Sequence, residues 1–94
     1  MITDAFPDQP RTAYLVAQCE SGLKMVQSNH IQPYGREESF GIFQIHARAW
    51  DKVAQSMGLD YKNNVRDNIE MAKYIYQQSG WKAWTCYNDH VAIR

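Results

Sequence analysis

Apolar residues recur every three to four positions along three stretches of the chain, and this spacing predicts three helices. The first helix is expected from about Arg11 to Ser21, with Pro10 in its first turn and Asp8 as its cap. Its apolar face is formed by Ala13, Val16 and Ala17. Glu20 falls on the same face, and Gly22 can end the helix in a left-handed conformation. The pattern therefore places a carboxylate in line with apolar side chains at the end of a helix.

The second helix is expected from about Phe43 to Met57, with Gly58 as its stop. Its predicted buried face consists of Ile42, Ile45, Ala49, Val53 and Met57, with Trp50 beside them. The third helix is expected to begin after a capping asparagine, Asn63 or Asn64, and to run to Ser79 before Gly80. Its apolar positions are Ile69, Met71, Ala72, Ile75 and Tyr76.

The segments outside these helices follow other patterns. Residues 1–9 form a lead-in, and residues 24–39 are polar and rich in turn-forming residues. This composition predicts a long loop with, at most, a short hairpin around Tyr34 and Gly35. The tail, residues 81–87, is aromatic without a helical period, so we expect it to lie across the core. The sequence therefore predicts a mainly α fold in a single domain spanning residues 1–94.

Composition narrows the classes of partner. Ten acidic and ten basic residues cancel without a basic cluster, so nucleic acid is not an expected partner. No apolar run approaches the length that spans a membrane, and the first residues lack the plan of a signal peptide. Aromatic residues make up 13% of the chain, and carbohydrate sites commonly use such rings. The three histidines have no metal-ligand spacing, so neither a metal nor a cofactor is expected.

The predicted position of Glu20 gives its carboxyl group two reasons to hold a proton. Burial among apolar side chains disfavours the charged form, and the negative end of the helix dipole acts in the same direction. A glutamate whose pKa is raised in this way can donate a proton near neutral pH. The alternative is a glutamate in the last helical turn whose carboxylate extends into water, because glutamates are rarely buried.

Cys19 and Cys86 are the only cysteines and lie far apart in the sequence. They are either two buried free thiols or one disulfide that ties the first helix to the C-terminal segment. In an oxidising compartment, the even count and the small size of the chain favour the disulfide. Closing a loop of this length would stabilise the fold by about 4 kcal/mol in the chain-entropy model.

Several motifs occur in an order that resembles a known superfamily. Glu20-Ser21-Gly22-Leu23 is followed, after the polar segment, by Gly41-Ile42-Phe43-Gln44-Ile45. This order resembles the lysozyme-like soluble lytic transglycosylases and goose-type lysozymes, in which an E-S segment precedes G-L-M-Q-[LI]. The chain is also similar to the resuscitation-promoting factors of actinobacteria, in which a disulfide joins C-E-S-G to G-W-x-A-W-x-x-C. Here the second cysteine comes one residue earlier, and the resemblance spans about residues 12–87.

The resemblance implies a small lysozyme-like domain whose long loop or minimal β-hairpin lines a substrate groove. It makes Glu20 the catalytic acid and base in cleaving the β-1,4 bond between N-acetylmuramic acid and N-acetylglucosamine. It also implies substrate contacts at Ser39, Gln44 and Ile45, and a disulfide between Cys19 and Cys86.

The superfamily further carries a tyrosine on the third helix that faces the catalytic glutamate. Tyr74 and Tyr76 are the candidates here, and Tyr76 is preferred because it shares a helical stripe with Ile69 and Ala72. Further polar residues that a groove rim could use are Asn29, Gln32, Tyr34 and Asp89.

The resemblance leaves two reaction classes open. A lytic transglycosylase uses one glutamate as acid and then as base, so that the muramyl C6 hydroxyl forms a 1,6-anhydro end without water. An inverting hydrolase needs a second carboxylate to hold a water. Glu37 and Glu38 are the candidates, unless they form a solvated turn with Arg36. Goose-type enzymes carry an aspartate soon after the G-L-M-Q segment, where His46 stands here, so the transglycosylase is favoured.

A non-catalytic glycan-binding module on the same scaffold is the alternative of a different class. In each case the expected partner is the glycan strand of peptidoglycan. The protein is expected to be a monomer and to act outside the cytoplasm, whether secreted, periplasmic or delivered by a phage.

Overall fold

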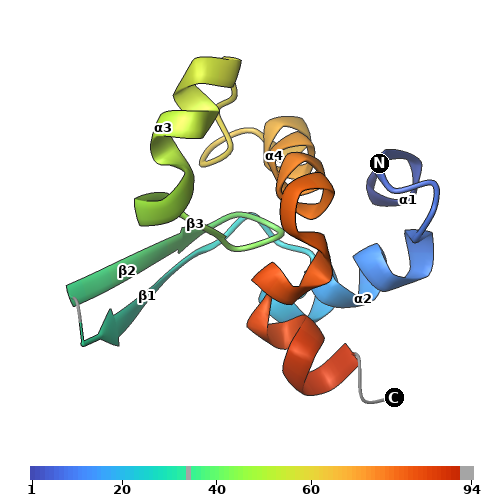
Figure 1. The fold of residues 1–94 in the computed structure, drawn as a ribbon, viewed down its shortest axis with the longest axis horizontal. Helices are drawn as coiled ribbons and strands as arrows, with labels where there is room; N and C mark the ends of the chain where they lie inside the picture. The colour runs from blue at the N-terminus through green and yellow to red at the C-terminus, as the bar shows by residue number, and fades with distance from the viewer. Residues whose placement is uncertain (34, 92–94) are drawn as a thin grey trace.

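The computed structural model describes residues 1–33 and 35–91 and has a mainly α fold with a small antiparallel sheet (Figure 1). The helices are α1 (Ile2–Ala5), α2 (Pro10–Ser21), α3 (Ala47–Met57) and α4 (Val65–Ser79), followed by the 3₁₀-helix η1 (Gly80–Ala83) and the π-helical turn η2 (Tyr87–Val91). The strands are β1 (Gln27–Gln32), β2 (Gly35–Phe40) and β3 (Ile45–His46), in the order β1-β2-β3. The hairpin of β1 and β2 extends to one side of the fold with the start of α3 beside β2, whereas the C-terminal segment packs against α2 and the end of α4 (Figure 1).

Helix α2 confirms the first predicted helix, apart from its cap. The residue before the helix is Gln9, without a side-chain cap, so the prediction for Asp8 is wrong. The predicted apolar face is fully buried at Ala13, Val16 and Ala17. At the other end, Gly22 has a φ of 67°, and its N–H bonds back to the last helical turn. The helix therefore stops at Ser21 and leaves Glu20 in its last turn.

The polar segment 24–39 contains a full β-hairpin, where the sequence predicted a loop with a short hairpin at most. Strands β1 and β2 pair antiparallel over their whole length. Side chains along β2 alternate, since Glu37 and Ser39 are buried whereas Arg36 and Glu38 are exposed. One face of the hairpin therefore presents a glutamate and a serine to the rest of the molecule.

The second predicted helix begins at Ala47 instead of about Phe43. The preceding residues form a tight turn, in which Gly41 and Gln44 have φ angles of 83° and 49°, and then strand β3. A left-handed residue interrupts a right-handed helix, so Phe43 and Ile45 are buried by the turn and the strand and not by a helix face. Within α3 the core side is formed by Trp50, Val53 and Ala54, whereas Ala49 and Met57, predicted to be buried, are exposed.

A buried asparagine on α4 holds this turn in place. Asn68 is fully buried, and its Nδ2 donates to the carbonyl oxygens of Phe40 at 2.9 Å and Tyr61 at 2.8 Å. Its Oδ1 accepts a hydrogen bond from the backbone N–H of Phe43 at 3.0 Å. A Cβ at Gly41 would lie 2.0 Å from Asn68 Nδ2, so only glycine fits at that position. Asn68 therefore fixes the segment that the resemblance assigned to sugar binding.

Helix α4 confirms the third predicted helix at both ends. The side chain of Asn64 caps it by accepting a hydrogen bond from Asp67 N at 2.9 Å, and Gly80 follows its last residue, Ser79. Its inner face consists of Asn68, Ile69, Met71, Ala72 and Ile75. Apart from the asparagine, these are residues that the apolar spacing predicted.

An aromatic cluster closes the core beneath the C-terminal segment. Trp81 and Trp84 are buried, with ring centroids 5.5 Å apart, and Trp84 Nε1 donates to the carbonyl oxygen of Phe43 at 2.9 Å. The ring of Phe6 lies 5.2 Å from that of Trp81. The lead-in therefore contributes a core residue, and the tail covers the core as predicted, although in short helical turns.

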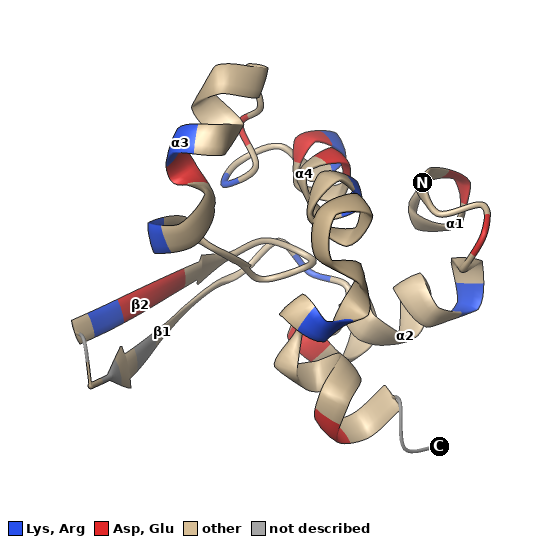
Figure 2. Ribbon diagram, in the orientation of Figure 1, with Lys and Arg blue, Asp and Glu red and all other residues tan. Residues whose placement is uncertain are grey.

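Acidic and basic residues are interspersed over the helices and β2 (Figure 2), in keeping with the balanced composition. Along residues 1–33 and 35–91, every helix is too short or too polar to cross a membrane.

Candidate active site

The carboxyl group of Glu20 is partly buried at the C-terminal end of α2. Burial raises its pKa from 4.5 to about 7, and a hydrogen bond from the backbone N–H of Cys86 opposes this rise by favouring the charged form. The rise in pKa and one of its two predicted causes, desolvation, agree with the prediction from the apolar stripe, whereas the helix dipole is not among the causes found. Near neutral pH the group is present both as acid and as carboxylate. Such a group can donate a proton and later accept one.

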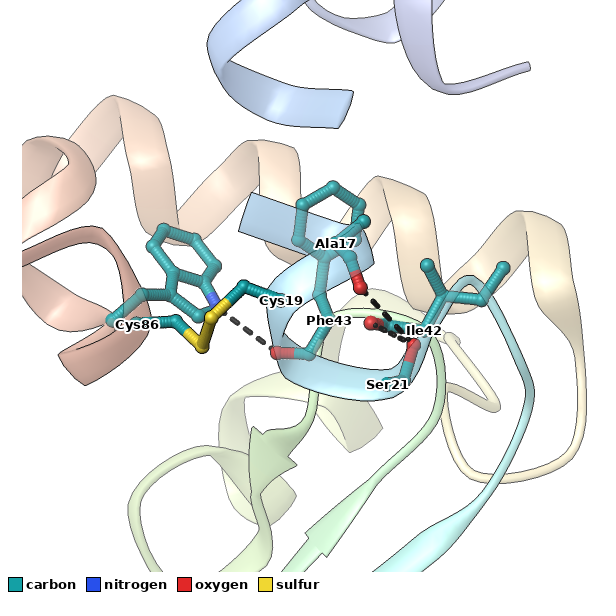
Figure 3. Close-up of a disulfide and its surroundings, with 7 residues drawn as sticks. Ala17, Cys19, Ser21, Ile42, Phe43 and Cys86 are labelled. Carbon is teal, nitrogen blue, oxygen red and sulfur yellow. Dashed lines mark hydrogen bonds between the residues drawn. A yellow bond between two sulfur atoms is a disulfide. The ribbon is translucent and has the colours of Figure 1, made fainter. Parts of the chain in front are cut away.

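Both sequence neighbours of Glu20 are tied to other parts of the fold (Figure 3). Cys19 forms a disulfide with Cys86, with their Cα atoms 6.0 Å apart, which confirms the predicted pairing. On the other side, Ser21 Oγ donates to the carbonyl oxygen of Ile42 at 2.7 Å. The end of α2, which carries Glu20, is thus fixed to the C-terminal segment and to the 41–44 turn.

A cavity of about 510 Å³ opens beside Glu20, among the sheet, α3, α4 and the C-terminal segment. It is lined by Glu20, Ser39, Gln44, Ile45, His46, Ala49, Trp50, Ile75, Ala83, Trp84, Thr85, Cys86, Asp89 and His90. Ligand sites commonly have volumes of about 300–1,000 Å³ and combine apolar or aromatic walls with a few polar groups. The volume and the lining of this cavity fit that description.

Ser39 and Ile45, both predicted to contact substrate, line this cavity together with Glu20. Ser39 is 1% exposed, and its Oγ has no hydrogen-bond partner among residues 1–33 and 35–91. A buried hydroxyl that lacks a partner is costly, and the oxygen itself has almost no exposed surface. Ile45 is buried and supplies an apolar part of the wall.

Gln44 also lines the cavity, but its amide group is engaged by the protein. Its Nε2 lies 2.9 Å from the carbonyl oxygens of Val26 and Gly41, and its Oε1 accepts a hydrogen bond from the Ser28 hydroxyl. These bonds join the start of β1 to the turn that precedes β3. The described contacts of Gln44 are therefore structural, and its hydrogen bond to a sugar stays a prediction.

Glu37 and Glu38 are not among the residues that line this cavity but line a smaller one of about 200 Å³, so their role beside the substrate stays a prediction. Glu38 is exposed, and its Oε2 accepts a hydrogen bond from Gln27 Nε2 at 2.9 Å. Glu37 is 3% exposed, and its Oε1 lies 3.6 Å from His46 Nδ1. Because His46 lines the cavity, Glu37 lies behind a residue of the cavity wall.

Tyr74 and Tyr76 are also absent from the cavity lining, so a tyrosine that faces Glu20 stays a prediction. Tyr74 packs against α3 and Tyr76 against the aromatic cluster. The residue of α4 that lines the cavity with Glu20 is Ile75. With about 3.6 residues in each helical turn, the neighbours of an inward-facing residue point to other sides of the helix. Tyr34, the remaining tyrosine candidate, lies outside the described residues.

Several side chains that line the cavity were not predicted as catalytic or substrate-binding residues. Trp50, at the start of α3, is partly buried and turns one edge toward Tyr74. His46 had been noted only as a departure from the goose-type pattern, and Asp89 only as a rim residue. Their places depend on how the tail and α3 fold around Glu20, and local spacing in the sequence carries no signal of that arrangement.

Within the described part of the chain, no group of three histidine, cysteine, aspartate or glutamate side chains comes together in a way that could hold a metal ion. No protein-family model, curated protein or solved structure matches the chain.

Proposed function

We propose that this chain is a peptidoglycan-cleaving enzyme that breaks the β-1,4 bond between N-acetylmuramic acid and N-acetylglucosamine. Its general acid and base is Glu20. The observation that carries the proposal is the Glu20 carboxyl group, which lies on the wall of a cavity of about 510 Å³ and has a pKa raised by burial to about 7. Glycosidic cleavage needs such a group, because the leaving oxygen must receive a proton near neutral pH. The order of the E-S-G and G-I-F-Q-I motifs supports peptidoglycan as the substrate.

In the first half of the reaction, protonated Glu20 gives its proton to the bridging oxygen as the bond from that oxygen to the muramyl C1 breaks. Charge then develops on the sugar ring and on the carboxylate. The backbone N–H of Cys86, which already favours the charged form of Glu20, stabilises the carboxylate at this stage. Desolvation thus favours the protonated form of Glu20 before the reaction, and the Cys86 amide stabilises the carboxylate that forms when the proton leaves.

Of the two reaction classes, we propose a lytic transglycosylase. In the second half of the reaction, the Glu20 carboxylate takes the proton of the muramyl C6 hydroxyl, whose oxygen bonds to C1 and forms a 1,6-anhydro end. This route needs no second carboxylate, in keeping with the places of Glu37 and Glu38 outside the cavity lining. Hydrolysis is a second candidate because His46 and Asp89, which could hold a water, do line the cavity.

The architecture that we propose for this chemistry is a small lysozyme-like domain whose hairpin lines a glycan groove. Ser39 on β2 and Ile45 on β3 support this proposal, because both line the cavity beside Glu20. The Cys19–Cys86 disulfide supports a location outside the cytoplasm, because disulfides persist in oxidising compartments. The proposed partner is a peptidoglycan glycan strand, bound by a monomer.

The test is Glu20→Gln, assayed on purified peptidoglycan by counting new reducing ends and new anhydromuramyl ends separately. We expect wild-type protein to release anhydromuramyl ends and Glu20→Gln to release them at least about 100-fold more slowly, because the general acid is lost. The matched control is Glu38→Gln, which removes an exposed carboxylate outside the cavity lining and should retain the wild-type rate.

The outcomes separate the candidate functions. Undiminished cleavage by a folded Glu20→Gln variant would refute the role of Glu20. Wild-type protein that binds glycan strands but releases ends of neither kind would be a binding module. Reducing ends alone would identify a hydrolase.

A further inference from the structure

A histidine with a buried carboxylate behind it lines the same cavity as Glu20. His46 ends β3 and directly precedes α3, so its backbone is held between two regular elements. Its side chain is 48% exposed, whereas that of Glu37 is only 4% exposed, and His46 Nδ1 lies 3.6 Å from Glu37 Oε1. The carboxylate therefore lies near one nitrogen of the ring, and His46 is one of the residues that line the cavity.

This arrangement selects one form of the neutral imidazole. A carboxylate beside Nδ1 favours the tautomer that carries its proton on Nδ1, and Nε2 is then the proton acceptor. The same contact stabilises the buried carboxylate of Glu37, because a buried charge needs hydrogen-bond donors nearby. The strand alternation of β2 accounts for the placement, since it turns Glu37 inward and Glu38 outward.

We propose that His46 binds a water and takes its proton in a hydrolytic branch of the reaction, and that Glu37 is the positioning residue that sets the tautomer of His46. The proposal rests on the proposed function, because Glu20 must protonate the glycosidic oxygen. The water oxygen bonds to the muramyl C1 as the bond from C1 to the leaving oxygen breaks. The proton of Glu20 goes to the leaving oxygen, and one proton of the water goes to His46 Nε2. The products are a free reducing end and a free 4-hydroxyl, and no further reactant is needed.

Asp89 is the competing candidate for holding this water. It also lines the cavity, but it is exposed on η2, and no ion pair or hydrogen bond of its side chain is seen within residues 1–33 and 35–91. A general base must be held in a productive direction, and the contact with Glu37 gives His46 such a direction. His90, the other titratable group on this part of the wall, is exposed on the same turn as Asp89.

The test measures the ratio of reducing ends to anhydromuramyl ends in wild-type protein and in variants. We expect His46→Gln to lower the yield of reducing ends about 100-fold more than that of anhydromuramyl ends, because a general base is lost. We expect Glu37→Gln to lower the yield of reducing ends about 10-fold more than that of anhydromuramyl ends, because the substitution removes a partner that orients His46. Glu38→Gln is the matched control and should keep the wild-type ratio. A merely structural defect would lower both kinds of end together and leave the ratio unchanged.

A second measurement is independent of turnover. The ¹⁵N shifts of the imidazole should show the proton of neutral His46 on Nδ1 in the wild type, and Glu37→Gln should reduce that preference. A wild-type ring protonated on Nε2 would overturn the proposal. The proposal would also be overturned if His46→Gln kept the wild-type product ratio or if the wild type formed no reducing ends. A selective loss of reducing ends in Asp89→Asn alone would overturn it as well.

The two proposals fail in different ways. If Glu20→Gln stops cleavage while His46→Gln keeps the wild-type ratio, only the role of His46 is refuted. If Glu20→Gln cleaves as the wild type does, the proposed function is refuted, and the branch that depends on it is refuted with it.

Discussion

Replacing Glu20 by glutamine should make the protein more stable at alkaline pH and leave its stability unchanged at acidic pH. Glutamine has the shape of the protonated acid and keeps an oxygen that can accept the hydrogen bond from Cys86 N–H. It differs from glutamate in never carrying a charge. The effect of this substitution on stability therefore reports the free energy of ionising Glu20 inside the fold.

The magnitude follows from the raised pKa. In the unfolded chain the carboxyl group titrates near 4.5, whereas in the fold it titrates at about 7. Each unit of pKa corresponds to about 1.4 kcal/mol, so the difference between 4.5 and about 7 gives at most about 3.5 kcal/mol. Because Glu20 is only partly buried, water screens its charge, and we expect about 2 kcal/mol.

The sign of the pH dependence of stability is set by whether the folded or the unfolded state binds the proton of Glu20 more tightly. The folded state holds it more tightly, so the contribution of Glu20 is fully present below pH 4.5 and is lost as pH rises through about 7. The unfolding free energy of Glu20→Gln should therefore equal that of wild type at about pH 4 and exceed it by about 2 kcal/mol at about pH 8. Other titrating groups occur in both proteins and cancel in this difference.

The assay is urea unfolding of both proteins from about pH 4 to pH 9, followed by tryptophan fluorescence, with the slope on denaturant checked for constancy. Trp81 and Trp84 are buried and should report global unfolding. Glu38→Gln is the matched control, and its difference from wild type should stay within about 0.5 kcal/mol, as for most surface positions. A difference for Glu20→Gln that does not change with pH would refute the reasoning that burial raises the pKa of Glu20.

Two further predictions concern the ties that shape the site. Replacing Cys19 and Cys86 together by serine should lower the unfolding free energy by about 4 kcal/mol, because the bond closes a sequence separation of 67 residues. Urea unfolding measures the loss, and two titratable thiols in denatured but unreduced wild-type protein would contradict the bond itself. Asn68→Ala should cost about 3 kcal/mol or more, since it leaves three buried backbone groups, including Phe43 N, without their partner. Asn63→Ala is the exposed control, and an equal loss in both variants would contradict this role of Asn68.

The elements that the sequence predicted well are those whose ends carry local signals. Gly22 stops α2 and Asn64 caps α4 through contacts within a few residues, so the chain near each end contains the necessary information. Glu20 belongs partly to the same class, because the stripe of α2 predicts its inward direction, whereas the Cys86 segment beside it comes from the other end of the chain. The rise in its pKa and the main cause of that rise, burial, could therefore be anticipated.

The elements that the sequence did not predict depend on contacts between distant segments. The apolar spacing around Ile42 and Ile45 suits a helix, but Asn68 on α4 holds this segment as a turn. The hairpin strands are mostly polar, so their alternation is weak in hydropathy. Tyr76 was preferred because helical spacing defines a face, yet spacing alone does not say which face meets the cavity, and Ile75 lines it instead.

The contacts that fix Glu20 in space are also those that remove it from water, so the geometry and the acidity of the site are not independent. Cys86 illustrates the link, because its disulfide fixes the segment that covers Glu20 while its own N–H favours the charged carboxylate. Loosening that segment would admit water and lower the pKa of Glu20, but it would also remove the amide, which acts in the opposite direction. A change in the walls of the cavity should therefore have two opposed effects on the pKa of Glu20, and through that pKa it should alter the rate of cleavage. The pH profile of cleavage is for that reason more informative about this site than the rate at any single pH.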